Sequence, residues 1–247
     1  MKRLAILSLV LLFAIPLVAA EKEKLLLPVA PSVVYCDKHS KYDTRLIAFN
    51  GNAQSVDALC EGCEPLAAGT GTVVRGERHA MPAPAFMYVD KESAEGMQMT
   101  LLVESSDSNK PEERSYTELP IVRASDFRAG KINIVGVRMD KEFRKTLRIF
   151  GLDGQTPVPV RVRVFSIGEA WPAYQHIYWL LPQGGTSEEG LDLAPTFNME
   201  CDLSAYVGNY DDPVRVEVEP LMEGAKIWAF VSITNNKTQH FYTVVPR

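Results

Sequence analysis

Val158-Pro159-Val160-Arg161-Val162-Arg163-Val164 alternates valine with proline or arginine over its whole length. A period of two places the valines on one face of a β-strand and the other residues on the opposite face. Val214-Arg215-Val216-Glu217-Val218-Glu219 repeats the same pattern. Strands with one apolar face and one polar face are typical of antiparallel sheets. The two segments therefore predict an all-β fold.

Further strands are predicted wherever short apolar runs occur, and helical periodicity is scarce. These runs are Arg45–Phe49, Thr100–Val103, Ile132–Val135 and Ile227–Val231. Asn50-Gly51-Asn52 and Asp153-Gly154 lie between such runs and offer the residues that tolerate a positive φ in hairpin turns. We therefore expect a hairpin in which residues 44–49 pair with residues 54–59. Many short strands in one chain predict sandwiches or barrels.

The N-terminus has the pattern of a secretory signal peptide. Met1-Lys2-Arg3 is a short positive segment, and residues 4–19 form an apolar run broken by Ser8 and Pro16. Val18-Ala19-Ala20 offers a cleavage site, so we predict a signal peptide at residues 1–20, cleaved after Ala20. The alternative is an uncleaved membrane anchor. No later segment approaches membrane-spanning length, so the mature chain is predicted to be secreted or periplasmic.

The composition indicates a globular chain that does not bind nucleic acid. The 247 residues are 46% hydrophobic and 23% charged, which is apolar enough to bury a core. The net charge is -5, and no basic stripe is present for phosphate contacts.

A faint internal repeat divides the chain. Leu27-Pro28-Val29 precedes residues 42–50, as Leu119-Pro120-Ile121 precedes residues 143–151. Each half closes with a strand, a polar turn, a second strand and a proline; these stretches are residues 99–120 and 227–246. The repeat predicts two tandem antiparallel β-sandwich domains, at residues 21–124 and 125–247. Residues 166–189 have no counterpart in the first half.

The same stretches resemble poorly characterised exported bacterial proteins with tandem immunoglobulin-like β-sandwich modules. The resemblance is carried by residues 27–29, 42–50 and 143–149, and most strongly by the closing segment, residues 227–238. It implies an immunoglobulin-like fold and export from the cytoplasm. This group has no established catalytic motif, so the resemblance assigns no functional residue.

The four cysteines predict disulfides. Cys36, Cys60, Cys63 and Cys201 belong to a chain with an export signal, where thiols are usually oxidised. The expected hairpin would bring Cys36 near Cys60 or Cys63. The alternative is a zinc site, because Cys36, His39, Cys60 and Cys63 have the spacing of two zinc knuckles.

The sequence predicts neither an enzyme nor a bound cofactor. It has no HExxH motif, no nucleophile elbow and no glycine-rich phosphate loop. Its most distinctive group is aromatic and consists of Trp171, Tyr174, Tyr178 and Trp179, whose rings could bind sugars or a partner protein. The alternative is that His176–Leu181 is a buried strand.

Three functions follow from these features. The first is a non-enzymatic structural or adhesion-type protein that binds an unknown partner. The second is a carbohydrate-binding module that uses the aromatic residues of the 166–189 segment on a polysaccharide. The third is a zinc protein or hydrolase built on a β-sandwich. The sequence leaves the oligomeric state open, because exposed edge strands can pair two copies.

The cysteine prediction can be tested by intact mass spectrometry of the mature protein. We expect a denatured mass that is lower by about 4 Da than the reduced mass, because two disulfides remove four hydrogens. The thiols should resist alkylation until they are reduced. Free thiols, together with one zinc ion in the native mass, would contradict the disulfides and favour the zinc site.

Overall fold

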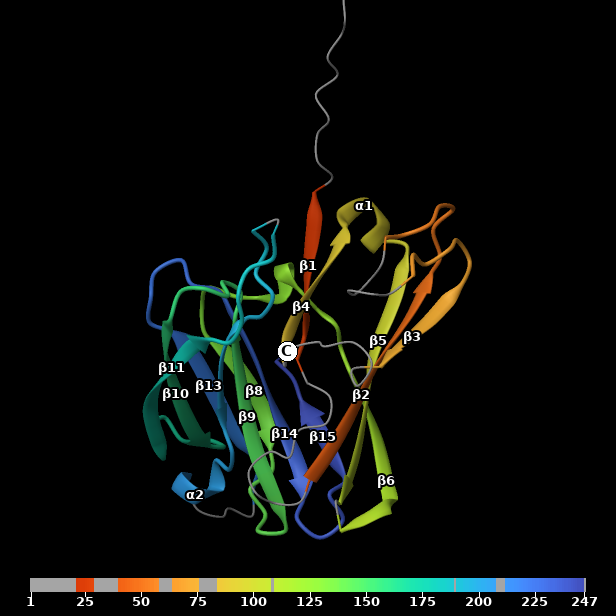
Figure 1. Cartoon of the computed structure of the whole chain (residues 1–247). Helices are drawn as coiled ribbons and strands as arrows, with labels where there is room; N and C mark the ends of the chain where they lie inside the picture. The colour runs from red at the N-terminus through yellow and green to blue at the C-terminus, as the bar shows by residue number, and fades with distance from the viewer. Residues whose placement is uncertain are drawn as a thin grey trace, which may run out of the picture.

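The computed structural model describes residues 21–28, 40–57, 64–75, 84–107, 109–188, 190–207 and 212–246 (Figure 1). The described strands are β1 (Lys22–Leu27), β2 (Ser40–Asn50), β3 (Gly71–Arg75), β4 (Ala85–Asp90), β5 (Met97–Asp107), β6 (Lys110–Leu119), β7 (Val122–Arg123), β8 (Ile132–Val137), β9 (Phe143–Gly151), β10 (Val158–Ser166), β11 (Tyr174–Pro182), β12 (Thr196–Glu200), β13 (Val214–Pro220), β14 (Ile227–Asn235) and β15 (Phe241–Val244). The helices α1 (Lys91–Ala94) and α2 (Ser204–Val207) have four residues each, and no helix within these ranges could span a bilayer.

The first seven strands form two antiparallel sheets. One has the order β4-β1-β7 and the other the order β3-β2-β5-β6. Buried side chains from both sheets, such as Leu25, Leu46 and Val103, belong to one hydrophobic cluster. β1 lies near the centre of the molecule, between the two halves of the chain (Figure 1).

The remaining strands form one antiparallel sheet in the order β15-β14-β9-β12-β11-β10-β13-β8. This sheet curls so that β8 comes back into contact with β14 and β15, which nearly closes it into a barrel. The interior is filled by the alternating valines of β10 and β13, at 0–1% exposure, together with Leu147, Ile149 and Ile233. The alternating valines from which these strands were predicted are therefore the residues that fill this core.

β9 and β14 are buried on both faces. One face of this strand pair lines the core of the large sheet. On the other face, Phe150, Trp228 and Phe230 belong to the hydrophobic cluster of the first seven strands. Phe241 of β15 joins them and makes an edge-to-face contact with Tyr42 of β2, with ring centroids 5.4 Å apart. The two halves of the chain therefore share a core.

The predictions of an all-β fold and antiparallel sheets are confirmed. All six predicted strand segments lie within β2, β5, β8, β10, β13 and β14. The strand over His176–Leu181 also forms, but the prediction that it is buried is wrong, because Ile177 is 47% exposed and Trp179 is 54% exposed.

The predicted hairpin between residues 44–49 and 54–59 is also wrong. β2 pairs instead with β3 and β5, which come from farther along the chain. The buried amide of Asn50 donates to the carbonyl oxygens of Gln54 and Leu66, which holds the connecting loop in place. Neither Gly51 nor Gly154 has a positive φ. Gly51 lies close to other backbone, since a Cβ there would be 2.8 Å from the carbonyl oxygen of Gly96.

The segments of the predicted repeat occupy corresponding places in the sheets. β2 lies between β3 and β5, and β5 also pairs with β6. In the same way β9 lies between β12 and β14, and β14 also pairs with β15. The repeat itself stays a prediction, while the shared core makes the two halves depend on each other.

Phe230→Ala tests this dependence. Phe230 is fully buried and stacks with Phe150 at a centroid distance of 6.1 Å. We expect the variant to lose about 3–5 kcal/mol of unfolding free energy, because a large cavity opens in the shared core. Urea denaturation should show one transition for both halves. Phe49→Ala, at a site that is 41% exposed, is the matched control and should change stability much less. Two separate transitions would contradict the shared core.

Candidate functional site

β11 carries most of the aromatic residues that the sequence analysis selected, and the structure divides them between its two faces. Tyr174 and Tyr178 lie on the face toward the interior of the sheet, and both are half-buried. Trp179 lies on the outer face. Trp171 lies in the loop before β11 and is 83% exposed. The four residues therefore do not form one cluster.

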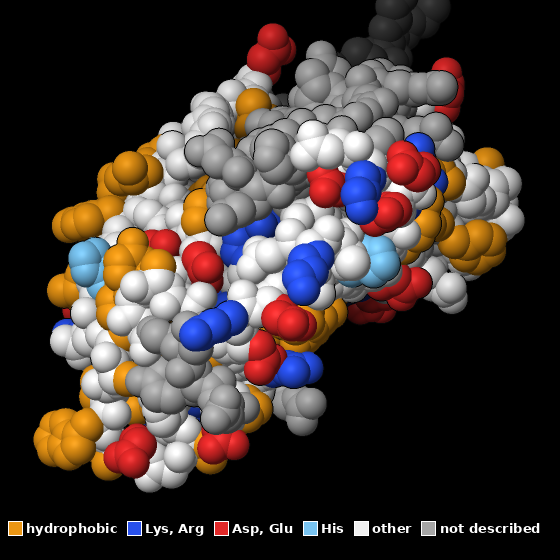
Figure 2. Space-filling view, turned by 90° about the horizontal axis from the view of Figure 1, so that it is seen from below, with side chains coloured by type: hydrophobic (Ala, Val, Ile, Leu, Met, Phe, Trp, Pro, Cys, Tyr) orange, Lys and Arg blue, Asp and Glu red, His pale blue; other side chains and the backbone are white. Residues whose placement is uncertain are grey.

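The outer face of β11 is an exposed apolar row. Ile177, Trp179 and Leu181 alternate along the strand and are 47%, 54% and 52% exposed. We call these three residues the β11 row. Figure 2 shows hydrophobic side chains gathered along the left edge of the molecule, the side on which Figure 1 places β10 and β11. Ile177 and Leu181 were not selected from the sequence, although their spacing of two from Trp179 places all three residues on one face of the strand.

Charged side chains lie beside the β11 row on the same face. In the antiparallel register, Pro159 of β10 is opposite Trp179 and Arg161 is opposite Ile177. Arg161 binds Glu219 of β13 at 3.3 Å, and Arg163 binds the same carboxylate at 2.7 Å. The outer face therefore combines the apolar β11 row with charged residues of β10 and β13 that pair with one another.

The inner face of β11 carries a ladder of aromatic rings. The hydroxyls of Tyr174 and Tyr178 are 2.9 Å apart, and the Tyr178 hydroxyl donates to Glu200 of β12 at 3.1 Å. Tyr206 of α2 stacks on Tyr174, with centroids 5.2 Å apart, and His176 meets Tyr178 edge to face. Glu200 and Tyr206 were not selected from the sequence, because they come from other elements. β11 and β12 pair through their backbones only at Leu181 and Pro182. Along the rest of β11, the side chains of the ladder connect it to β12 and α2.

The tyrosine hydroxyls of the ladder act as hydrogen-bond donors rather than as acids or bases. Burial is the main cause that raises the pKa of Tyr178, and the hydrogen bond from Tyr174 and the negative charge of Glu200 raise it further. Burial also raises the pKa of Tyr174. Both phenols therefore stay protonated at neutral pH, which favours a structural role for this face.

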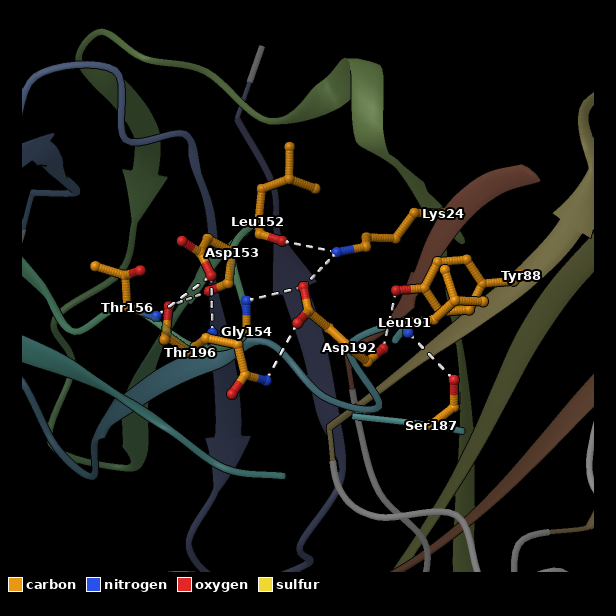
Figure 3. A network of polar contacts seen from close by, with 11 residues as sticks. Lys24, Tyr88, Leu152, Asp153, Gly154, Thr156, Ser187, Leu191, Asp192 and Thr196 are labelled. Carbon is orange, nitrogen blue, oxygen red and sulfur yellow. Dashed lines mark hydrogen bonds and ion pairs between the residues drawn. The ribbon is translucent and has the colours of Figure 1, made fainter. Parts of the chain in front are cut away.

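A polar network anchors the loop that follows β11 (Figure 3). Lys24 of β1 donates to Asp192 at 2.8 Å and to the carbonyl oxygen of Leu152 at 3.2 Å. The ammonium also lies 4.4 Å from the ring centroid of Phe86, in a cation–π contact. Tyr88 donates to the backbone carbonyl of Asp192 at 2.9 Å. The strands β1 and β4 thus hold the end of β11 through this loop.

The carboxylate of Asp192 is the centre of this network. Its oxygens accept hydrogen bonds from Lys24, from the backbone of Gly154 at 3.2 Å and from the Gln155 amide at 3.1 Å. Burial alone would raise the pKa of Asp192, but these hydrogen bonds and the charge of Lys24 outweigh it, so the pKa lies below its ordinary value. Gly154 is required here because a Cβ would collide with the carbonyl oxygen of Ala194.

A cavity of about 600 Å³ adjoins this network. Lys24, Asp153, Asp192 and Lys226 contribute to its lining. Lys24 and Asp192 bind each other, and one Asp153 oxygen accepts from the backbone amides of Gln155 and Thr156. Three of these four charged groups, those of Lys24, Asp153 and Asp192, bind other parts of the chain, so the cavity is a weaker candidate than the β11 row.

The cysteine and zinc predictions fall largely on residues that the structure does not describe. Cys36, His39, Cys60 and Cys63 all lie outside the described ranges. Cys201 is described, and no free cysteine occurs among the described residues. Within the described residues, no group of three or more His, Cys, Asp or Glu side chains is placed to hold a metal ion.

Comparisons with protein-family models, curated proteins and solved structures found no match to this chain. The resemblance to exported immunoglobulin-like proteins therefore stays a prediction. The function is therefore inferred from the chemistry of the β11 row and its surroundings.

Asp192→Asn tests the network that holds the loop after β11. At pH 7 we expect it to lower the unfolding free energy by about 1–2 kcal/mol, because charge-assisted hydrogen bonds are lost. The native pKa of Asp192 is lowered, so its stabilisation is complete above about pH 5 and is lost as the pH falls below the ordinary value of about 3.9.

Urea denaturation at pH 7 and pH 3 measures this effect. The difference in unfolding free energy between the unmodified protein and the Asp192→Asn variant should be smaller at pH 3 than at pH 7. Glu95→Gln, at an exposed position, is the control and should match the unmodified protein at both values. Equal stability of the Asp192→Asn variant at pH 7 would show that the network does not stabilise the fold.

Proposed function

We propose that this protein is an exported, non-catalytic binding module that docks a protein partner through the β11 row. The observation that carries the proposal is the row of three large apolar side chains, each about half exposed, on a strand without a charged residue. A second exposed group of three residues, formed by Ile47, Phe49 and Val73, lies on β2 and β3 but contains no tryptophan. Tryptophan is enriched among the residues that contribute most to protein interfaces.

The surroundings of the β11 row favour a protein partner over a sugar. Protein interfaces combine an apolar centre with a polar rim, and the ion pairs of Arg161 and Arg163 supply such a rim. Sugar hydroxyls need polar groups that are free to bond, whereas these guanidinium groups already bind Glu219. Carbohydrate binding is the alternative, and the high exposure of Trp171 is the observation that favours it.

Export and the two-module organisation are part of the same proposal. The signal pattern of residues 1–20 supports a secreted or periplasmic protein, and the first described strand begins at Lys22, after the predicted cleavage site. The matching strand order around β2 and β9 supports two immunoglobulin-like modules. The lack of a free cysteine among the described residues supports a disulfide framework. The zinc or hydrolase alternative rests on residues outside the described ranges.

Site-specific photo-cross-linking tests the docking surface. A benzophenone amino acid replaces Trp179 in one variant and Tyr116 of β6 in the other, and both proteins are irradiated in the cells that produce them. The two sites are matched, since Trp179 is 54% exposed and Tyr116 is 53% exposed. We expect a discrete protein adduct at position 179 and none at position 116, because β6 carries charged residues that discourage docking.

Three results would count against the proposal. Adducts of equal yield at both positions would indicate random collision. The absence of an adduct at position 179 would contradict docking through the β11 row. Retention of the pure protein on an insoluble polysaccharide, abolished by Trp171→Ala, would favour the carbohydrate alternative.

A further inference from the structure

The number and the positions of the cysteines limit how they can pair. Cys201 lies within the described ranges, and no free cysteine occurs there. The three other cysteines of the chain, Cys36, Cys60 and Cys63, all belong to its first half. A disulfide of Cys201 within one chain must therefore link the two halves. The described residues that flank the other cysteines show which of them is within reach.

Cys201 lies beside the first residues of β9. It directly follows β12, which pairs with β9. The Thr146 hydroxyl donates to the carbonyl oxygen of Cys201 at 2.9 Å, and the Leu203 amide donates to the carbonyl oxygen of Lys145 at 3.0 Å. Cys201 is therefore fixed at the end of the large sheet where β9 begins.

The beginning of β2 lies at the same end of the large sheet. Ser105, which is opposite Tyr42 of β2, donates to the carbonyl oxygen of Gln239 at 3.0 Å. Gln239 belongs to the turn after β14, and β14 ends at Asn235, opposite Phe143, the first residue of β9. Figure 1 shows the beginning of β2 and α2 at the bottom of the molecule, whereas β2 ends toward the upper right.

The chain from Tyr42 back to Cys36 is long enough to reach Cys201. Tyr42 packs against Phe241 of β15, and the sheet order β15-β14-β9-β12 contains three strand spacings, which together measure about 14 Å. The six residue steps from Cys36 to Tyr42 span up to about 20 Å, and a disulfide adds about 5.5 Å between Cα atoms. The available length exceeds the width of the sheet, so Cys36 can bond Cys201.

The cysteines of residues 60–63 lie beyond the opposite end of β2. The side chain of Asn50, the last residue of β2, donates to the carbonyl oxygen of Leu66, which pairs with Val56. Each cysteine is three or four positions from Val56 or Leu66, so chain and disulfide together reach about 20 Å. The eleven residues of β2 separate its two ends by about 33 Å, which places Cys201 out of their reach.

We propose that a disulfide joins Cys36 to Cys201 and links the two halves of the chain. Cys60 then pairs with Cys63, and no cysteine is left for the zinc alternative. This inference rests on the disulfide framework of the proposed function and names its pairs. For each bond, two thiols lose two protons and two electrons. A disulfide of a protein oxidant in the export compartment accepts them and is reduced to two thiols.

Peptide mapping of the mature protein without reduction tests the pairing. Free thiols are first blocked by alkylation, and trypsin then places the four cysteines in three peptides, residues 25–38, 46–75 and 164–215. We expect peptides 25–38 and 164–215 to be cross-linked and to separate on reduction. Peptide 46–75 should be lighter by about 2 Da than its reduced form, because it contains an internal disulfide.

Two kinds of result would overturn the pairing, and they differ in what they say of the proposed function. A bond between peptides 25–38 and 46–75, or between two copies of peptide 164–215, would contradict the pairs but leave a disulfide framework in place. Alkylation of all four cysteines before reduction would contradict the framework as well. Docking through the β11 row is tested separately, by photo-cross-linking.

Cys36→Ser and Cys201→Ser are matched variants that remove the same bond. Each should expose one thiol to alkylation, that of the remaining partner, and both should lower the melting temperature by a similar amount. Cys60→Ser is the control and should leave peptides 25–38 and 164–215 cross-linked. A Cys201 thiol that still resists alkylation in the Cys36→Ser variant would show that the pairing is wrong. If the serine variants do not fold, the peptide map of the unmodified protein decides.

Discussion

Burial of β9 and β14 on both faces is the constraint on which the rest of the structure depends. One face of this strand pair closes the core of the large sheet, and the other completes the core of the first seven strands. Such strands must contain apolar residues at consecutive positions, as Ile227-Trp228-Ala229-Phe230-Val231 does. Basic residues of β9 are buried as well and need partners: Lys145 donates to the carbonyl of Asp140, and Arg148 donates to Ser232 at 2.6 Å. Burial lowers the pKa of Lys145, although the nearby Asp202 and Asp140 oppose that change.

The candidate site on β11 is far more exposed to solvent than β9 and β14. β11 belongs to the same sheet, but only Leu180 among its residues is fully buried. The tyrosine ladder binds the inner face of β11 to β12. The loop after β11, which the Lys24–Asp192 ion pair anchors, holds its C-terminal end. A strand that is fixed at one end and on one face can present its outer face in a rigid form. Rigid presentation lowers the entropy cost of binding, which favours β11 as a docking element.

The sequence predicted the strands well because local alternation reports which side chains face a core. It failed where partners are distant in the chain. The predicted hairpin beyond Asn50 assumed that a strand pairs with its nearest neighbour, whereas the side chain of Asn50 holds a loop and β2 pairs with β3 and β5. The exposure of β11 was missed for a similar reason. The sequence pattern of an apolar strand is the same whether or not another layer of the protein covers that strand. Tyr174 and Tyr178 were among the aromatic candidates selected from the sequence, but Glu200 and Tyr206, which complete their ladder, come from elements that only folding brings near.

The sequence by itself determined the all-β class and the valine faces of β10 and β13, because a period of two in side-chain character is a local property of the chain. It also placed aromatic residues in the 166–189 segment. Tertiary structure decided which of them are exposed, and that β9 and β14 serve two cores. It also decided that Lys24 meets Asp192 across 168 residues. These features depend on which layers pack together, and packing between layers is set by the whole chain rather than by any single segment.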